Sequence, residues 1–555
     1  MLRFALLSVL AGAQLHAQSR PADLIVINAR VYTVDDARPV VSALAVRDGR
    51  IAFTGSVREA MALKGTGTRV IDAGGRTIIP GMVDAHAHLL GLGQSLRSVP
   101  LYGAKSYDEV IARVVARANG VAPGQWILGR GWDQNQWGDT RFPSHEALSR
   151  ALPNNPVYLT RVDGHAGLAN AAAMRAASVG AATPDPGGGR IERSASGEPS
   201  GVFVDNAKEL VERAIPRETR AQIRAEIRAA IAESQHWGLV GLHDAGESRA
   251  TIDLMEEMAK AGEIPFRLYV MVGDDSAAVA HYLARGPQSG LYDNHLWIRS
   301  IKLYADGALG SRGAALLEPY SDDPKNNGLL LSAPAHIQDV ATRALRAGFQ
   351  VATHAIGDRG NRLVLDAYAA ALEAVPTADH RFRVEHAQII NHDDIPRFAE
   401  LGVIPSMQAV HQTSDMYWAG ARLGLGRLLG AYAWRSLLNT GVVVPNGSDF
   451  PVEAVNPLLS FHSAVARQDA ENWPAGGWMP EQKMTREEAL KSMTIWPAFA
   501  GFQEAAMGSL TAGKFADFVI LDRDIMTVAD RDILGTTVVA TYIGGKPVYE
   551  RAARP

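Results

Sequence analysis

The chain has 555 residues, of which 47% are hydrophobic and 21% charged, and these ordinary values exclude a disordered or a fibrous protein. Lysine and arginine total 55 against 59 aspartates and glutamates, so the net charge of −4 predicts no nucleic acid partner and no attraction to acidic lipid. The absence of cysteine excludes disulfides, thiol nucleophiles, iron–sulfur clusters and thiolate metal sites.

The first 17 residues have the pattern of a secretory signal peptide. Arg3 supplies the positive charge, an apolar run extends from Phe4 to Ala13, and Ala17 precedes the expected cleavage point. A short membrane anchor is the alternative, but the run is well below the ~20 residues that span a bilayer. We therefore expect a periplasmic or secreted protein that does not contact the membrane after signal removal, as a monomer or a homo-oligomer.

Both ends of the mature chain carry short apolar segments separated by turn residues such as Asp48-Gly49 and Gly544-Gly545, which is typical of strands. The expected strands are residues 23–28, 43–47, 50–54, 68–72, 518–521, 538–543 and 547–549. Together they predict one composite β-sandwich domain made of residues 18–77 and 505–555. Two unrelated hairpins would give the same pattern.

Between these ends, short apolar strands alternate with helical stretches such as Arg220–His236 and Pro334–Ala347. The expected strands are Ile78–Asp84, Leu239–Asp244, Phe266–Val272, Ile298–Tyr304, Phe349–His354, Phe382–His386, Val403–Met407 and Val442–Asp449. Eight strands that alternate with helices predict a parallel (β/α)₈ barrel, an α/β fold, over residues 78–504.

The segment from about Ser106 to Asn206 is too long to be one connection of such a barrel. It is rich in glycine, proline and tryptophan, and its sequence predicts a hairpin that pairs residues 190–192 with residues 201–203. We expect an inserted subdomain that follows the first barrel strand. Because that strand ends at the catalytic mouth of a barrel, the insert is expected to cover the site.

Polar side chains stand at the ends of the predicted barrel strands. His86 and His88 end the first strand, and their spacing of two places both imidazoles on one face, where they can chelate one metal ion. The other strand ends contribute Lys302, His354, His386 and Asp449. Since barrel enzymes assemble their sites from the C-terminal ends of several strands, this set predicts a metal-dependent active site rather than a group of core histidines.

Several longer motifs accompany these residues in a fixed order. They are Pro80-Gly81-Met82-Val83-Asp84-Ala85-His86-Ala87-His88, Gly129-Arg130-Gly131-Trp132-Asp133, Asp163-Gly164-His165, Lys302-Leu303-Tyr304-Ala305-Asp306-Gly307, Thr353-His354-Ala355-Ile356-Gly357-Asp358, Val384-Glu385-His386, Gly447-Ser448-Asp449-Phe450-Pro451 and Gly513-Lys514-Phe515-Ala516-Asp517-Phe518-Val519. Over nearly the whole chain this pattern resembles the amidohydrolase superfamily, and within it the YtcJ-like branch of the amidohydrolase-3 family. The resemblance implies a distorted (β/α)₈ TIM barrel with a flanking β-sandwich and one or two divalent metals, usually zinc.

The resemblance also implies a role for each strand-end residue. His86, His88 and Asp449 would bind the first metal, and His354 and His386 the second. Lys302 would bridge the two as a carbamate formed with carbon dioxide, which supplies two anionic oxygens where a free ammonium would be repelled. An ion pair between Lys302 and a nearby acid such as Asp306 is the alternative.

A site of this kind predicts hydrolysis of a C–N bond in a small amide by metal-activated hydroxide. Asp449 would accept the proton of the attacking water and pass it to the leaving nitrogen. An ester, lactone or carbamate would suit the same site, and a catalytically silent ligand-binding protein is the alternative from another class. A serine or cysteine nucleophile is excluded, because the chain has no G-x-S-x-G motif and no cysteine.

Candidate substrate-binding residues come from the insert and from the loops. In the insert, Trp132 and His165 are expected to face the metals, with Asp133 and Trp137 nearby, although packing within the subdomain would also explain them. Outside it, Arg312 would bind a substrate carboxylate or form a loop salt bridge. Gln408 and His411 follow the seventh strand and would reach the substrate carbonyl.

Overall fold

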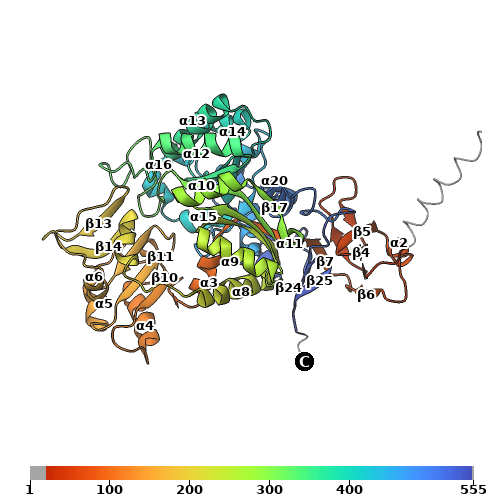
Figure 1. Cartoon of the computed structure of the whole chain (residues 1–555), viewed down its shortest axis with the longest axis horizontal. Helices are drawn as coiled ribbons and strands as arrows, with labels where there is room; N and C mark the ends of the chain where they lie inside the picture. The colour runs from red at the N-terminus through yellow and green to blue at the C-terminus, as the bar shows by residue number, and fades with distance from the viewer. Residues whose placement is uncertain (1–19, 553–555) are drawn as a thin grey trace, which may run out of the picture. The chain divides into compact units, whose positions relative to one another are not determined.

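The computed structural model describes residues 20–552, so the predicted signal peptide lies outside the described residues. The chain forms two compact units, and Figure 1 follows it in colour from red to blue. Unit 1 comprises residues up to Val83, the segment Ser234–Gly241, and the chain from Arg486 onward, whereas unit 2 holds Asp84–Glu233 and Leu242–Thr485. Of the helices between residues 20 and 552, none combines the length and the apolar character that a membrane span requires.

Unit 1 contains two sheets built from both ends of the chain. The four-stranded sheet has the order β5-β4-β1-β6, and the six-stranded sheet has the order β25-β24-β23-β7-β2-β3. The strands are β1 (Leu24–Ile27), β2 (Arg30–Tyr32), β3 (Val40–Val41), β4 (Ala43–Arg47), β5 (Arg50–Gly55), β6 (Arg69–Asp72), β7 (Thr77–Pro80), β23 (Phe518–Leu521), β24 (Val538–Ile543) and β25 (Lys546–Glu550). The helices are α2 (Val57–Met61), α19 (Arg486–Ser492) and α20 (Ile495–Ala500).

The two sheets of unit 1 share one hydrophobic core, to which Val26 and Leu44 of the first sheet and Ile78 and Phe518 of the second contribute. Strand β23 pairs antiparallel with β7, with Val519 opposite Ile79, so the N-terminal and C-terminal segments meet in one sheet (Figure 1). Burial of this shared apolar face requires both ends of the chain. The expected composite sandwich is therefore part of the fold.

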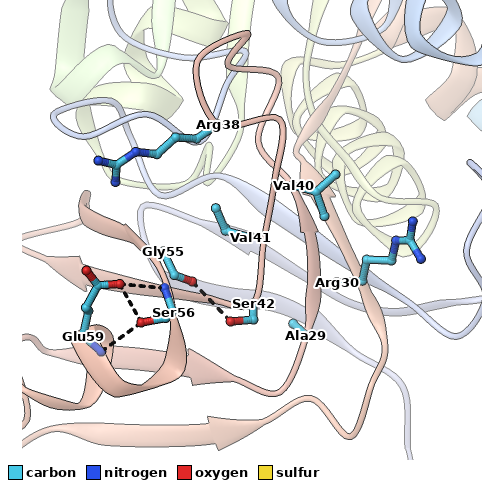
Figure 2. Close-up of a pocket in the computed structure, with 9 residues that line it drawn as sticks. All are labelled: Ala29, Arg30, Arg38, Val40, Val41, Ser42, Gly55, Ser56 and Glu59. Carbon is cyan, nitrogen blue, oxygen red and sulfur yellow. Dashed lines mark hydrogen bonds between the residues drawn. The ribbon is translucent and has the colours of Figure 1, made fainter.

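A hollow of about 690 Å³ lies on unit 1, between the edge strands of its two sheets (Figure 2). Its one carboxylate, Glu59, belongs to a capping box in which Ser56 begins helix α2 and the two residues bond each other's backbone. The hydroxyl of Ser42 donates to the carbonyl of Gly55. The polar groups of the hollow thus serve the local fold.

Unit 2 contains the barrel except for the first residues of β8 and β15, and the strand order of the barrel is β22-β21-β20-β19-β18-β16-β15-β8. Its strands are β8 (Met82–Ala87), β15 (Leu239–Glu247), β16 (Arg267–Val272), β18 (Leu296–Tyr304), β19 (Gln350–Ala355), β20 (Arg383–His386), β21 (Ile404–Gln408) and β22 (Asn446–Gly447). The pairs from β16 to β22 are parallel. The last strand also meets the first. The amide of Asp449, which follows β22, donates to the carbonyl of His86 on β8 at 2.7 Å.

Helices separate these strands and cover the barrel. They are α3 (Leu89–Ser95), α8 (Arg220–His236), α9 (Arg249–Lys260), α10 (Ser276–Arg285), α12 (Pro334–Ala347), α13 (Asp358–Ala374), α14 (Ile395–Leu401), α15 (Ala409–Asp415), α16 (Ala419–Leu428), α17 (Trp434–Leu438) and α18 (Pro457–Ala466). Long members such as α12 bury one face only, as expected of helices that pack on a barrel. The predicted fold class is confirmed.

Two predicted barrel strands differ from the observed ones. The stretch expected as one strand, Ile78–Asp84, is divided into β7 of unit 1 and β8 of the barrel, because Pro80 lacks an amide hydrogen and a Cβ atom on Gly81 would lie 2.4 Å from Val240. The last expected strand, Val442–Asp449, is reduced to the two residues of β22. Pro445 interrupts its hydrogen bonding on one side, and Asp449 adopts a left-handed conformation on the other.

The insert between α3 and α8 is a six-stranded sheet of order β13-β14-β12-β11-β10-β9 with its own helices. Its elements are β9 (Val99–Pro100), α4 (Tyr107–Ala118), β10 (Ile127–Trp132), α5 (Glu146–Ala151), β11 (Val157–Arg161), β12 (Ala166–Ala169), α6 (Ala171–Ala176), β13 (Gly189–Arg193) and β14 (Pro199–Asp205). The expected hairpin is β13–β14, with Ile191 opposite Phe203. A separate apolar core stabilises the insert.

Candidate metal centre

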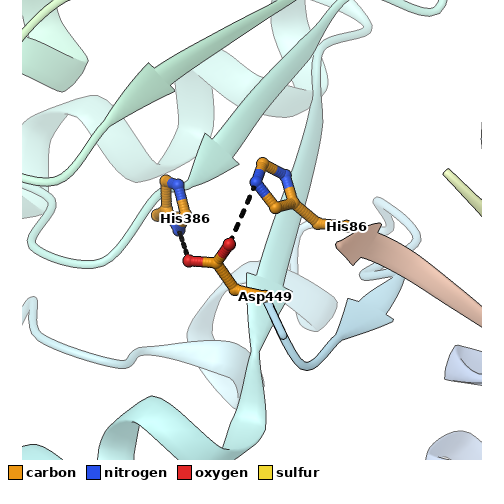
Figure 3. A group of neighbouring side chains, drawn as sticks. All are labelled: His86, His386 and Asp449. Carbon is orange, nitrogen blue, oxygen red and sulfur yellow. Dashed lines mark ion pairs between the residues drawn. The ribbon is translucent and has the colours of Figure 1, made fainter. Parts of the chain in front are cut away.

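Two histidines and one aspartate meet at the ends of barrel strands that are far apart in the sequence (Figure 3). His86 lies on β8, His386 ends β20, and Asp449 follows β22. Asp449 Oδ1 lies 3.6 Å from His86 Nε2, and Asp449 Oδ2 lies 4.0 Å from His386 Nδ1. All three residues are buried, and their ligand atoms lie within 4.8 Å of one another, which is the spacing that one metal ion requires of its ligands.

The backbone around this set is held by the carboxylate of Asp84. It accepts hydrogen bonds from the amide of His86 at 3.1 Å and from the amide and hydroxyl of Ser448 at 3.0 and 2.6 Å. A Cβ atom on Gly447 would lie 2.6 Å from the His86 nitrogen, so only glycine fits there. Asp84 therefore fixes the distance between the segments that carry His86 and Asp449.

Two of the three residues also have unusual backbone conformations. His386 has φ 72° and Asp449 has φ 61°, in the left-handed region that residues with a Cβ atom seldom adopt. Such conformations cost about 1–3 kcal/mol and persist where the surrounding structure imposes them, often at functional sites. The strain directs both side chains into the cluster.

Further imidazoles surround the three residues. His88 Nε2 lies 3.1 Å from Asp449 Oδ1, and the ring of His354 lies 4.5 Å from that of His386. His411 Nε2 lies 3.7 Å from Asp449 Oδ2 and has no hydrogen-bond partner although it is buried. The sequence-predicted metal ligands thus gather in one place, with His88 the most exposed of them.

The amine of Lys302 lies 3.4 Å from His86 Nε2 and 4.6 Å from the ring centroid of Tyr304. Burial lowers its pKa to about 8, even though the negative charges of Glu385 and Asp449 oppose this shift. Asp306 does not pair with it, because its carboxylate accepts hydrogen bonds from three backbone amides. The ion pair considered as an alternative for Lys302 is therefore absent.

Burial sets the charge of the cluster. It lowers the pKa of His86, His354 and His386 well below the ordinary value, so these imidazoles are neutral and each keeps a lone pair. Burial alone would raise the pKa of Asp449, but the hydrogen bond from His88 and the nearby histidines hold it below its usual range. Neutral imidazoles, an ionised carboxylate and an unpartnered buried nitrogen form a donor set that fits a divalent metal.

Comparison with known proteins gives the same result as the geometry. The sequence profile described as the Amidohydrolase family matches residues 69–549. The chain belongs to the amidohydrolase family. It is 32% identical to the putative amidohydrolase YtcJ of Bacillus subtilis over 94% of this chain and 98% of that protein, and 31% identical to the N-substituted formamide deformylase of Arthrobacter pascens over 95% and 98%.

A solved structure agrees. An uncharacterized metal-dependent hydrolase from Pyrococcus horikoshii superposes with a TM-score of 0.73 at 26% identity, covering 91% of this chain and 99% of that one. The family resemblance drawn from the sequence motifs is confirmed.

The structure corrects the expectation for Trp132 of this amidohydrolase. Its indole is fully buried in the core of the insert, near Trp137 and Phe142, and its Nε1 donates to the carbonyl of Leu159 at 2.7 Å. A large ring with one N–H group is stabilised where the ring is buried and the N–H is bonded. Trp132 therefore serves the fold of the insert.

The insert does reach the histidine cluster at its other candidate, His165. The ring of His165 lies 5.3 Å from that of His354, and its Nδ1 lies 2.7 Å from Asp205 Oδ1. Burial lowers the pKa of His165, but the hydrogen bond and charge of Asp205 outweigh burial and raise it overall. Asp205 itself has φ 50°, so this pair too is held in a strained backbone.

Two of the three candidates outside the insert, Arg312 and Gln408, are already bonded within the protein. Arg312 pairs with Asp322 at 3.0 Å, which is the loop salt bridge considered as its alternative role. Gln408 accepts from His386 Nδ1 at 2.7 Å through Oε1 and donates to the carbonyl of Ser406 at 3.3 Å. Gln408 thus orients a histidine of the cluster, and its contact with a substrate carbonyl stays a prediction.

Sequence reasoning did not assign a role to the charged pair on β20, Arg383 and Glu385. Both side chains are fully buried, and Glu385 contacts His86 Nδ1. A signal was present, because two charged residues at a spacing of two lie on one face of a buried strand, and such residues are almost never fully buried unless paired.

Proposed function

We propose that this amidohydrolase hydrolyses the C–N bond of a small amide in a metal-dependent reaction. The observation that carries the proposal is the buried set of His86, His386 and Asp449, whose ligand atoms lie within 4.8 Å of one another. The relative from Arthrobacter pascens bears the name N-substituted formamide deformylase, and a formamide is an amide. Histidine and carboxylate ligands with one open position are typical of hydrolytic metal sites.

For the metal ligands we propose His86, His88 and Asp449 at a first position and His354 and His386 at a second. Lys302 would bridge them after its amine adds to carbon dioxide and loses a proton, which yields a carbamate with two oxygens. The lowered pKa of about 8 supports this step, because only the neutral amine can add to carbon dioxide. Zinc is the metal that suits this set of imidazole and oxygen ligands, with one or two ions bound.

A divalent metal held by these residues would supply Lewis acidity to the scissile carbonyl and make a water molecule more acidic. Asp449 would orient the attacking water and accept its proton on a carboxylate oxygen. Its low pKa keeps that oxygen ionised at neutral pH and ready for the transfer. The same oxygen would then deliver the proton to the leaving nitrogen, while His165 contacts the substrate from the side of the insert.

The test is a panel of small substrates measured with the purified protein and with its metal-stripped form. Elemental analysis gives the metal and its stoichiometry, and the panel contains N-formyl and N-acyl amines, N-acyl amino acids, esters, lactones and carbamates. We expect cleavage of at least one amide, loss of activity with chelator, and recovery with Zn²⁺. Cleavage of esters or lactones alone would contradict the C–N assignment, and a metal-free protein with no turnover would indicate a binding protein.

The proposed bridge is tested at Lys302. We expect Lys302→Ala to lose bound metal, and a short carboxylic acid added to that variant to restore part of the metal content and activity. A fully active enzyme whose crystal structure shows a free Lys302 amine directed away from the metals would contradict the carbamate. Crystals for this experiment need neutral or higher pH, since acid removes carbon dioxide from a carbamate.

A further inference from the structure

A buried charged pair lies directly behind the metal centre. Arg383 and Glu385 point to the same side of β20, and neither side chain is exposed. Arg383 Nη2 donates to Glu385 Oε2 at 3.1 Å, and Arg383 Nε lies 2.6 Å from Glu385 Oε1 without making a second hydrogen bond, so the two groups form a close buried ion pair. The second oxygen, Oε2, also contacts His86 Nδ1.

The chemistry of the two charged groups determines the direction of each hydrogen bond. The carboxylate of Glu385, paired with a guanidinium, is an acceptor, and His86 Nδ1 is therefore the donor toward it. His86 thus carries its ring hydrogen on Nδ1, directed at the carboxylate of Glu385. Its lone pair is left on Nε2, the atom that lies 3.6 Å from Asp449 Oδ1.

The guanidinium of Arg383 is also held by hydrogen bonds to groups other than Glu385. Its Nη1 lies 2.7 Å from His243 Nδ1, and its Nη2 donates to the carbonyl of Ala85 at 2.6 Å and to the hydroxyl of Ser406 at 2.8 Å. A guanidinium cannot accept, so His243 must accept at Nδ1. Arg383 is thus tied to β8, β15 and β21, which leaves Glu385 a single orientation.

A buried ion pair of this kind contributes little to the stability of a fold. Removing two charges from water costs more than their attraction returns in many proteins, and an apolar replacement is often neutral or stabilising. Here the pair faces His86, an imidazole whose lone pair must point into the cluster to bind a metal. A carboxylate that holds the outer nitrogen of a metal-binding histidine fixes the ring and makes its inner nitrogen a stronger ligand.

We propose that Glu385 and Arg383 are positioning residues that fix His86 as a metal ligand through Nε2 and thereby set the metal affinity of this position. The inference rests on the proposed function, because it requires that His86 binds a metal. It predicts that loss of the carboxylate weakens metal binding while His86 itself is still present.

The experiment measures metal binding directly. Metal-stripped protein is titrated with Zn²⁺ against a chromophoric chelator, and with Co²⁺ by its visible spectrum, for the wild type and for Glu385→Gln. We expect the apparent dissociation constant of the variant to rise about 10- to 100-fold, which is the usual effect of removing such a partner, with an altered Co²⁺ spectrum. The amide of the variant can still accept from Nδ1, so the change reports the lost charge and the released Arg383.

The matched control is Asp394→Asn. Asp394 is also a buried carboxylate held by two arginines, Arg362 at 2.8 Å and Arg397 at 3.0 Å, and it belongs to no metal ligand set. We expect this control to lose stability to a similar extent and to bind Zn²⁺ within about twofold of the wild type. A general effect of breaking a buried ion pair would weaken binding in both variants, and that result would overturn the proposal.

A second variant is needed in case Glu385→Gln does not fold. Glu385→Asp keeps the charge beside Arg383 but shortens the side chain by one methylene, so it cannot reach both partners, and we expect the same weakening. Wild-type affinity in the variant that folds overturns the inference, as does failure of both to fold when Asp394→Asn folds. A wild-type protein that binds no metal would overturn the proposed function as well, so the two failures are distinguishable.

Discussion

The barrel strand ends and the insert both carry buried polar and aromatic side chains, but they differ in how those groups are satisfied. In the insert, the indole N–H of Trp132 is bonded to a backbone carbonyl, and Arg161 pairs with both Asp133 and Asp163. At the strand ends, His411 Nε2 is buried without a hydrogen-bond partner beside Asp449. Because buried polar groups in proteins are nearly always bonded, an unpartnered nitrogen beside a carboxylate and several histidines is suited to a ligand.

One residue pair of the insert belongs with the strand ends by the same criterion. Asp205 bonds His165 through one oxygen, while its other oxygen, Oδ2, is buried with no hydrogen-bond partner. Cβ atoms on Gly307 and Gly313 would lie 2.8 and 2.6 Å from that oxygen, so the loop after β18 packs closely against the pair. The insert thus contributes to the site through His165 and Asp205, whereas Trp132 and Arg161 support its own fold.

The largest effect is expected at Asp449. Asp449→Asn should reduce kcat by about 10²–10⁴-fold, because an amide cannot take the proton of the attacking water. Steady-state kinetics on the best amide, with metal content measured in parallel, checks this. Asp139→Asn is the control, since Asp139 is an exposed carboxylate paired with Arg141. More than a tenth of the wild-type rate in Asp449→Asn would remove Asp449 from the proton transfer.

Trp132→Ala should instead act on stability. Loss of a fully buried tryptophan from a packed core costs about 3–5 kcal/mol, and the cost should be confined to the unfolding of the insert. Chemical denaturation followed by hydrogen exchange in the insert measures it, with Trp132→Phe as the milder comparison. Metal content and the order of substrate preference should be unchanged. A changed order without a loss of stability would contradict the structural role.

His165→Ala should change the substrate profile at constant metal content. Hydrogen bonds to charged groups are worth about 1.5–3 kcal/mol, so we expect kcat/KM for the preferred amide to fall by roughly tenfold or more. The order of preference among amides should also change. His145→Ala is the control from the same insert, because the imidazole of His145 bonds the nearby Ser149. Equal profiles for the two variants would show that the insert has no contact with substrate.

The smallest effect is expected at Arg312. Its salt bridge with Asp322 is partly exposed, and Asp322 keeps Arg422 as a second partner. Arg312→Ala should therefore lower the free energy of unfolding by only about 0.2–1 kcal/mol and leave kcat/KM unchanged. Thermal denaturation and kinetics on a substrate that carries a carboxylate provide the check. A rise in KM limited to such substrates would restore Arg312 as a substrate ligand.

Much of the fold and of the candidate metal centre could be predicted, because periodic patterns and strand ends are local properties of the sequence. Helices α8 and α12 begin and end at the predicted residues, and His86, His386 and Asp449 were identified from their places after apolar strands. The division of the first strand was not foreseen, since it depends on the packing of Gly81 against Val240.

For a related reason, the sequence left the role of Trp132 open between substrate contact and packing, and it did not identify the bond between Gln408 and His386. Residue type alone cannot show whether a polar atom is already bonded by the protein, and the partners of both side chains lie elsewhere in the chain. Glu385 could have been found, because a charge on a buried strand two residues after Arg383 requires an explanation. Hydrogen-bond partners distant in sequence are the information that only the folded chain supplies.

The pairing of β7 with β23 has a consequence for biosynthesis. Strand β7 is made early and β23 close to the end of translation, so the six-stranded sheet cannot close until nearly the whole chain has left the ribosome. Until then β7 has a free apolar edge of the kind that joins with other chains. A chain that ends prematurely would keep that edge exposed permanently, and prematurely terminated copies should therefore aggregate even when the barrel and its metal ligands are complete.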